Sequence, residues 1–475
     1  MMAAARTLLR PENGVLIPAL CGIQLLLITV PALWSINYSW IVSAGVVALV
    51  GLAFSTRRTL IALTVLTIVL PDPIYKSISL PMGLRLAEIL LIAAFLFCLI
   101  DIFYRRDLAV TRSSADLLLL GFLTVAVLSV GVGLYHEHDT STIFRNARFP
   151  LYYAVVFLVV QAIDRETVLR IFVPLLVLSA AAVAAGYILE FLGAIDLSAG
   201  ERFFRVARRQ GIILPVALLL IVNLVLFAPQ RYGRLTLVLL FLPIGLALAL
   251  TVGRAMWVSF ALGLVISMWL RYGEGSMAKA RLWLGVMLTL ITLAFLVGSV
   301  LLFQRFTGTA ITAHAVERSR TFVDYSRDVQ VVGRILGYTR ALEAIAEHPI
   351  LGSGQGKTLT FYSFNPDTDQ FETWRSWTLD SLYLTLWLKM GLPGTILFLW
   401  LYLHILRCAR STFAGSDDPS VRCFASAMIA SLVAMLALGI SDGSLVNGRF
   451  AIVFAVLFGL VLVTAGGGRH ASRAE

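Results

Sequence analysis

Runs of about 20 apolar residues recur along most of this chain, and a helix needs a run of that length to cross the hydrocarbon core of a bilayer. Because backbone polar groups cannot stay unpaired in lipid, repeated runs of this kind fit a bundle of membrane-spanning helices. The composition agrees, since 59% of the 475 residues are hydrophobic and only 14% are charged. We therefore expect an all-α polytopic membrane protein with about 12–14 transmembrane helices.

The apolar runs divide the chain into three parts. We expect transmembrane helices 1–11 within residues 1–303, a large loop with its own amphipathic helix at 304–378, and the C-terminal transmembrane helices at 379–475. The predicted spans are 14–33, 38–54, 59–71, 84–104, 116–135, 149–163, 168–192, 211–228, 234–252, 254–271, 281–303, 379–407, 421–440 and 449–467. The first run follows Arg6 and Arg10 as in a signal peptide, but no small-residue cleavage site follows it, so we expect a retained helix.

Basic residues indicate the orientation, because lysine and arginine concentrate in cytoplasmic loops. With the N-terminus inside, the inner loops hold nineteen basic residues and the short outer loops hold ten. The rule gives little weight to long loops, so the comparison rests on the short ones. We expect both termini inside and the loop 304–378 outside.

The stretch LGSGQGKT, at residues 351–358, is close to a phosphate-binding P-loop. The first glycine of that motif is replaced by Leu351, and the stretch follows a helix-like segment and His348-Pro349 instead of a strand. A loop outside the membrane also meets no ATP. We interpret the stretch as a glycine-rich turn that ends a helix.

The four cysteines predict neither a disulfide framework nor a metal site. Cys21 and Cys98 lie in predicted spans, and Cys408 and Cys423 flank an inner loop. Their spacing is not that of a metal-binding motif.

Arginines gather in the outer loops, although the orientation rule disfavours them there. They are Arg145 and Arg148 at the sixth span, Arg202, Arg205, Arg208 and Arg209 in AGERFFRVARRQG, and Arg254 in LTVGRAMW. The guanidinium fork binds two phosphate oxygens at once, so this set suits a phosphate-bearing substrate. The alternative is that the four arginines at 202–209 contact lipid headgroups. Arg254, in an apolar hairpin, is costly to bury and is a functional candidate by default.

The segment GRILGYTRALEAIAEHPI predicts an amphipathic helix that begins near Arg334 and ends at His348. Asp380 follows at the mouth of a span, with Tyr383 one turn along. A carboxylate there could accept a proton from a sugar hydroxyl, or it could cap the helix, and the sequence leaves both open. His348 is a second candidate base, although a His-Pro pair at a helix end is typical of a structural position. His348 and Tyr383 complete the expected substrate-binding set.

From about Arg254 to Gly394 the chain resembles the bacterial O-antigen ligase and Wzy-type polysaccharide polymerase superfamily. LTVGRAMW is similar to the family's Thr-x-Ser-Arg-Gly/Ala hairpin, with Gly253 in place of the serine. GRILGYTRALEAIAEHPILGSGQG resembles the family's loop signature of an arginine, a helix and Pro-x-x-Gly-x-Gly. LDSLYLTLWLKMGLPG is similar to the His-Asn-x-x-Leu segment that ends in Gly-x-x-Gly.

The resemblance implies a metal-independent glycosyltransferase of the bacterial inner membrane that works without a cofactor on the periplasmic side. Its donor would be a glycan on undecaprenyl pyrophosphate, attacked by an acceptor hydroxyl while arginines stabilise the leaving pyrophosphate. By position, Arg254 and Arg334 match the family's essential arginines, and Asp380 takes the place of the ligase histidine. This departure favours a polymerase of O-antigen or exopolysaccharide repeats over a ligase that uses lipid A-core.

The resemblance also implies the partners: the lipid-linked donor, a glycan or lipid-linked acceptor, membrane lipids and a chain-length regulator protein, but no nucleic acid. Two other functions are compatible with the sequence. A protein O-oligosaccharyltransferase would share these signatures and differ in its acceptor. A flippase or secondary transporter of lipid-linked glycans would also have many spans, but it would be expected to show internal repeats and no structured outer loop.

Overall fold

The computed structural model describes residues 57–68, 85–100, 103, 111–192, 209–228, 233–251, 253–272, 298, 329–365, 370–446, 448 and 450–466. Within these ranges the chain is mostly helical, which confirms the all-α polytopic class. Six of the described helices are long and apolar enough to cross a membrane, and four shorter ones are also apolar. The predicted spans 14–33, 38–54 and, apart from Gly298, 281–303 lie outside the described residues.

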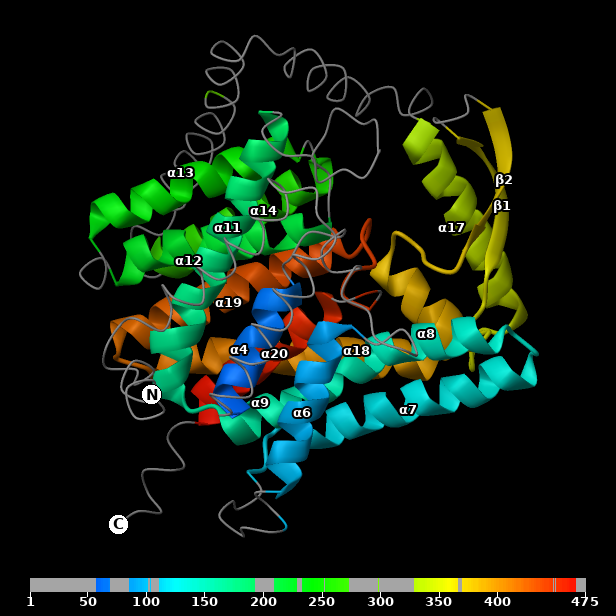
Figure 1. Ribbon diagram of the computed structural model, residues 1–475, viewed down its shortest axis with the longest axis horizontal. Helices are drawn as coiled ribbons and strands as arrows, with labels where there is room; N and C mark the ends of the chain where they lie inside the picture. Colours follow the sequence, from blue (N-terminus) through cyan, green and yellow to red (C-terminus); the bar gives the residue numbers. More distant parts are fainter. Residues whose placement is uncertain are drawn as a thin grey trace, which may run out of the picture.

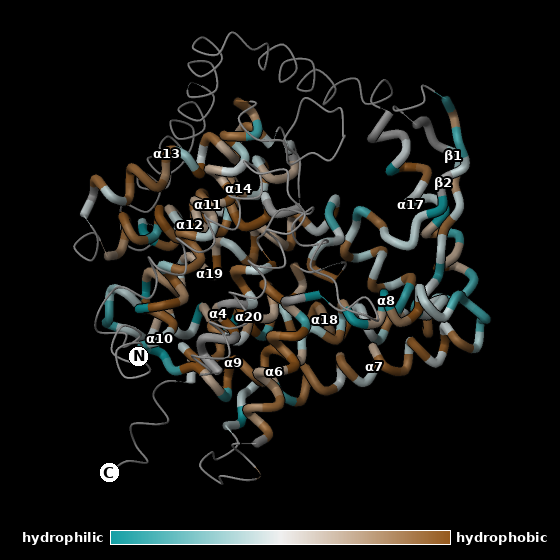
Figure 2. The backbone as a smooth tube through the Cα atoms, viewed as in Figure 1, coloured by the Kyte–Doolittle hydropathy of each residue, from teal (hydrophilic) through white to brown (hydrophobic). Residues whose placement is uncertain are grey.

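Most of the helices lie alongside one another in one bundle, and α17 stands with two strands beside one end of it (Figure 1). The helices before the large loop are α4 (Arg57–Ile68), α6 (Leu86–Ile100), α7 (Asp116–Tyr135), α8 (Thr140–Leu151), η4 (Tyr152–Ala154), α9 (Val155–Ala162), α10 (Arg165–Thr167), η5 (Val168–Phe172), α11 (Val173–Phe191), η6 (Arg209–Ile212), α12 (Ile213–Phe227), α13 (Arg234–Leu250) and α14 (Arg254–Tyr272). The later elements are α17 (Val329–Glu347), β1 (Leu359–Asn365), β2 (Gln370–Ser376), α18 (Leu382–Gly415), α19 (Pro419–Leu438) and α20 (Phe450–Gly466). Hydrophobic residues dominate the bundle helices, and hydrophilic ones gather at the α7–α8 turn and on the strands (Figure 2).

Two helix boundaries differ from the predicted spans for local reasons. The helix predicted at 149–163 begins at Thr140, because the Asp139 carboxylate caps it by accepting the Thr142 N–H at 2.8 Å. Its first turns are polar, so the apolar run covers only its second half. α18 continues to Gly415, and Gly391, with φ +66°, breaks the helical geometry inside it. The predicted span 116–135 coincides with α7.

Aromatic contacts bring four helix ends together at one end of the bundle. The ring of Phe227, at the end of α12, lies 5.5 Å from that of Phe413, near the end of α18. The Arg271 guanidinium, in the last turn of α14, lies 5.6 Å from the Phe227 ring. The Arg422 guanidinium, in the first turn of α19, lies 5.0 Å from the Phe413 ring. Because α19 begins where the other three helices end, it runs antiparallel to them.

A buried set of hydrogen bonds fixes how α12, α14 and α19 lie relative to one another, and so locates the opposite end of the bundle. Asn223 of α12 donates to Ser267 of α14 at 2.9 Å and accepts from Ser426 of α19 at 2.6 Å, which aligns the three helices at one level. Further along, the Leu382 N–H of α18 donates to the Gly439 carbonyl after α19 at 2.8 Å. We call this end, formed by the starts of α14 and α18 and the end of α19, the loop end.

An aromatic cluster packs the centre of the bundle. The rings of Phe122, Tyr153, Phe398, Tyr402 and Phe458 meet at centroid distances of 5.2–6.1 Å, several of them edge to face. The two phenols are buried and donate to the carbonyl oxygens of Leu445 and Leu432 at 2.9 and 2.7 Å. The cluster joins α7 and η4 to α18 and α20 in the core of the bundle.

The LGSGQGKT stretch packs backbone against backbone on α7 and α18. Three of its N–H groups donate to carbonyl oxygens: Gly352 to His348 (2.9 Å), Ser353 to Leu388 (2.7 Å) and Gln355 to Ser129 (2.9 Å). N–H groups already paired in this way cannot cradle phosphates as a P-loop does. The stretch is therefore a turn packed against α7 and α18, which agrees with the predicted glycine-rich turn at the end of a helix. We call it the docked turn.

We expect Gly133→Ala to loosen this docking, because a Cβ at Gly133 would lie 2.1 Å from the Gln355 carbonyl oxygen. Forcing the two backbones apart should cost on the order of 1–3 kcal/mol of unfolding free energy, measurable as a lower thermal midpoint in detergent. Gly131→Ala is the matched control, since nothing lies within 4 Å of its Cβ position on the same helix. An equal midpoint for the two variants would contradict close backbone docking.

A two-stranded antiparallel hairpin, which the sequence patterns do not predict, follows the docked turn. β1 and β2 are rich in aromatic residues, which favour strands, and Phe361 pairs with Trp374 across them. Leu359 of β1 forms a small core with Ala341 and Ile345 of α17 and with Leu388 of α18. This core places α17 and the hairpin against the loop end.

Candidate active site

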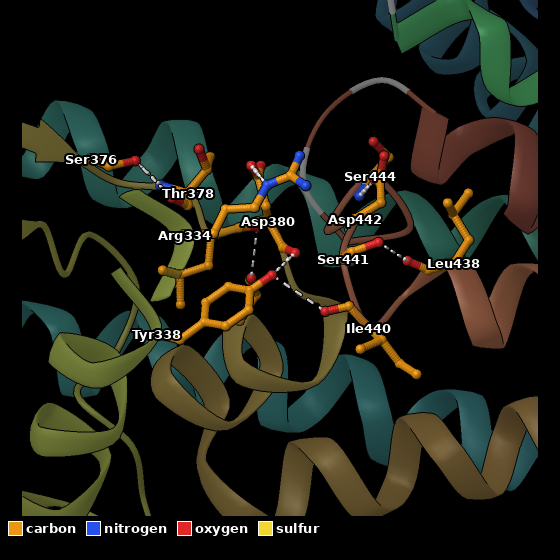
Figure 3. Close-up of polar contacts among 12 residues, drawn as sticks. Arg334, Tyr338, Ser376, Thr378, Asp380, Leu438, Ile440, Ser441, Asp442 and Ser444 are labelled. Carbon is orange, nitrogen blue, oxygen red and sulfur yellow. Dashed lines mark hydrogen bonds and ion pairs between the residues drawn. The ribbon is translucent and has the colours of Figure 1, made fainter. Parts of the chain in front are cut away.

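An ion pair joins two candidate residues that lie far apart in the sequence, Arg334 and Asp380. Arg334 Nε lies 3.1 Å from Asp380 Oδ2, with Arg334 on α17 and Asp380 in the turn before α18 (Figure 3). The two side chains are 42% and 59% exposed, so the pair is open to a ligand from outside the bundle. α17 therefore brings its arginine to the mouth of a membrane-spanning helix.

Tyr338 fixes the turn that carries Asp380. It lies one helical turn after Arg334, and its phenol donates to the Asp380 carbonyl oxygen at 2.5 Å (Figure 3). Burial, aided by the nearby Asp380 and Asp442 carboxylates, raises the pKa of Tyr338 to about 12 against the lowering effect of Arg334. The phenol therefore stays protonated, and remains a hydrogen-bond donor, at neutral pH.

The first turn of α18 is capped by Ser381, not by Asp380. The Ser381 side chain accepts from the Leu384 N–H at 3.5 Å, and its backbone is extended as an N-cap requires. The Asp380 carboxylate instead points to Arg334 (Figure 3). Of the two roles that the sequence left open for this carboxylate, capping is therefore carried out by its neighbour.

Two residues of this site were missed by the sequence analysis, Tyr338 and Asp442. Asp442 lies in the turn between α19 and α20, where its Oδ1 accepts the Ser444 N–H at 2.6 Å beside the Arg334–Asp380 pair (Figure 3). The sequence feature that could have identified Asp442 is its position as the only carboxylate between the last two predicted spans, in a predicted outer loop. Two carboxylates and a phenol beside an arginine can accept hydrogen bonds from several sugar hydroxyls.

The backbone of Arg254 also lies at the loop end. Arg254 opens α14 and precedes Ser267 by thirteen residues, or roughly 20 Å at 1.5 Å per residue. Gly439, at the end of α19, follows Ser426 by the same number of residues. Asn223 holds the two serines at the same level of the bundle. The start of α14 therefore lies at the same level as Gly439, whose carbonyl accepts the Leu382 N–H.

Of the 202–209 arginines, only Arg209 is described. A Cβ added at Gly211 would lie 3.5 Å from Sδ of Met256, in the first turn of α14. The short helix η6, which begins at Arg209, therefore lies beside the start of α14. The structure describes Arg209 and Arg254 by their backbone alone, and Arg202, Arg205 and Arg208 lie outside the described residues.

Arg145 and Arg148 have different neighbours although both lie on α8. Arg148 Nη1 forms an ion pair with the buried Glu88 at 3.1 Å, and the Tyr152 hydroxyl donates to the same carboxylate. The Arg145 guanidinium instead lies 4.9 Å from the centre of the Trp377 ring. The structure thus ties Arg148 to α6 and leaves Arg145 beside an aromatic side chain.

His348 and Tyr383 lie away from the carboxylates. His348 follows the last turn of α17, about 21 Å along the helix from Arg334, and its ring is 4.7 Å from that of His136. The Tyr383 hydroxyl donates to the Leu436 carbonyl at 2.7 Å and so points to α19. In this arrangement, neither side chain contributes a group to the Arg334–Asp380 pair.

Within the described ranges, no group of three or more His, Cys, Asp or Glu residues could hold a metal ion. Cys98, Cys408 and Cys423 are free thiols.

Part of the chain is similar to a known protein family. Residues 235–399 match the family described as O-antigen ligase, and no curated protein matches the chain. The matched segment runs from α13 to the middle of α18 and includes Arg254, Arg334 and Asp380. The match supports the resemblance seen in the sequence, and it identifies residues 235–399 of this multi-pass membrane protein as similar to the O-antigen ligase domain of the ligase and polymerase superfamily.

Proposed function

We propose that the chain is an inner-membrane glycan polymerase that extends O-antigen or exopolysaccharide repeats on the periplasmic side. The observation that carries this proposal is the exposed Arg334–Asp380 pair at the loop end, inside the segment that matches O-antigen ligases. The pair offers an acid–base group and a phosphate-binding group within 3.1 Å of each other. Glycan transfer from a lipid-linked diphosphate needs both.

The energetics of the pair allow it to open when substrate arrives. An exposed ion pair contributes only about 0–1 kcal/mol, because water and salt screen the charges. A hydrogen bond from arginine to a charged phosphate contributes about 1.5–3 kcal/mol. The Arg334 guanidinium would therefore exchange Asp380 for the diphosphate of the donor, leaving the carboxylate without its cation and free to meet the acceptor hydroxyl.

The reaction then follows from the two freed groups. The acceptor hydroxyl oxygen attacks the anomeric carbon of the donor glycan and gives its proton to Asp380. The bond from the anomeric carbon to the diphosphate oxygen breaks, and undecaprenyl diphosphate leaves with the electron pair. Arg334 and Arg254 stabilise the charge that develops on the leaving oxygen. Tyr338 holds the Asp380 backbone in place throughout.

The assay for this proposal uses the purified protein in detergent with lipid-linked repeat units as donor and acceptor. A polymerase should produce a ladder of lengthened chains on a gel. A single transfer onto lipid A-core, or onto a peptide, without a ladder would indicate the ligase or the protein glycosyltransferase instead. Failure of folded protein to lengthen or transfer any glycan would contradict an enzyme and favour the transporter.

The periplasmic placement has its own prediction. In a background without the four cysteines, an impermeant thiol reagent should label Thr360→Cys on β1 in intact cells. Ser411→Cys, an exposed position near the opposite end of α18, should react only after permeabilisation. The reason is the excess of basic residues in the inner loops. The reverse labelling would place the Arg334–Asp380 pair in the cytoplasm.

A further inference from the structure

Two cations converge on one indole ring near the loop end, apart from the Arg334–Asp380 pair. The Arg145 guanidinium of α8 lies 4.9 Å from the centre of the Trp377 ring, and Lys389 Nζ of α18 lies 5.8 Å from it. Because both distances are measured to the same point, the two charges are at most 10.7 Å apart. Phe149 stacks on the same indole. We call Arg145, Lys389, Trp377 and Phe149 the Trp377 cluster.

The charges of this cluster have no counter-ion among the described residues. Arg148 and Arg334 have carboxylate partners, Glu88 and Asp380, whereas neither Arg145 nor Lys389 forms an ion pair with any described residue. Lys389 is only 5% exposed, in a helix long enough to span the membrane. A buried ammonium without an anion is unfavourable, and the indole face compensates for only part of that cost.

Hydrogen-bonding side chains near the cluster are also buried without partners. Both side-chain atoms of Asn146 lack a partner, and this residue is 1% exposed. It lies one turn after Ile143, which touches the docked turn at Gly356, so it shares the face of α8 that meets that turn. The Ser353 hydroxyl is likewise buried and unpaired, while its N–H binds Leu388, next to Lys389. Buried polar groups are normally satisfied, so these atoms indicate a ligand.

We infer that the Trp377 cluster, with Asn146 and Ser353, is a binding site for a phosphate group carried by a lipid. Two cations and neutral donors from three elements suit a tetrahedral oxyanion better than a planar carboxylate, because they approach it from different directions. The site lies about two turns into α18 from Asp380, on the side of the loop end. The inference deepens the proposed function, since a lipid-linked donor carries such a group, but binding here does not require glycan transfer.

Lipid phosphate at this site has two sources, and the test separates them. The full-length protein, purified in a non-ionic detergent, is titrated with undecaprenyl diphosphate and, separately, with phosphatidylglycerol, while its thermal midpoint and ligand affinity are followed. We expect Lys389→Gln and Arg145→Gln each to raise the Kd for undecaprenyl diphosphate about 10- to 100-fold. The matched control is Lys357→Gln, a partly exposed lysine in the docked turn, which should bind as the wild type does.

The outcomes distinguish the inference from the proposed function. Weaker binding of phosphatidylglycerol alone in both variants would support the phosphate site and make the membrane its source. Unchanged affinity for both lipids in both variants would overturn the site. If Lys389→Gln fails to fold, Arg145→Gln decides, because this side chain is exposed and its loss leaves the core intact. Normal binding with no glycan transfer by wild type would overturn the proposed function and leave the site standing.

Discussion

Asp380→Asn is expected to lower the rate of chain extension about 10²–10⁴-fold, the range typical for loss of a general base. The amide keeps the size of the carboxylate but cannot take the proton of the acceptor hydroxyl. The helix start should be unaffected, because Ser381 caps α18. The exposed ion pair with Arg334 contributes only about 0–1 kcal/mol, so the variant should stay folded. The measurement is the initial rate of lengthening of lipid-linked repeats in detergent.

The matched control for this variant is Asp417→Asn. Asp417 is an exposed aspartate in the turn between α18 and α19, at the end of the bundle opposite the loop end. It should extend chains at the wild-type rate. Equal rates for Asp380→Asn and wild type would remove the base assignment but leave the polymerase, whereas inactive wild type would remove the polymerase itself.

Arg334→Ala is expected to lower extension about 10²–10³-fold, as for loss of a group that stabilises charge in the transition state. Arg334→Lys keeps the charge but loses the planar fork, so we expect it to be impaired, although less than the alanine variant. Because Arg334 is proposed to hold the diphosphate in the bound donor as well as during its departure, KM should rise while kcat falls, so kcat/KM should fall more than kcat. Steady-state rates over a range of donor concentrations would measure this.

Arg340→Ala controls for the loss of an exposed arginine from the same helix. Arg340 is 59% exposed on α17 and pairs with Glu343 at 2.7 Å, away from Asp380. Its removal should cost little stability and no activity. Full extension by Arg334→Ala would mean that the diphosphate is held elsewhere, and the Trp377 cluster would then be the first site to test.

The candidate site was only partly visible in the sequence. Arg334 and Asp380 could be nominated, because one opens a predicted amphipathic helix and the other precedes an apolar span. Their contact could not be predicted, since 46 residues separate them and local patterns carry no information on such distances. The position of Tyr338 one turn after Arg334 becomes meaningful only once the Asp380 carbonyl is known to lie beside it.

What the sequence determined by itself is the membrane-spanning class and the course of the more uniform helices. Hydropathy is a local property, and in lipid a long apolar run has little choice but to form a helix, so the predicted span 116–135 and α7 coincide. Only the tertiary structure determines which helix ends and turns lie next to one another. The docking of the glycine turn on Gly133, the Asn223 hydrogen bonds and the Arg334–Asp380 pair all join residues far apart in the chain. Such contacts depend on close packing and paired polar groups across elements, which no stretch of sequence specifies alone.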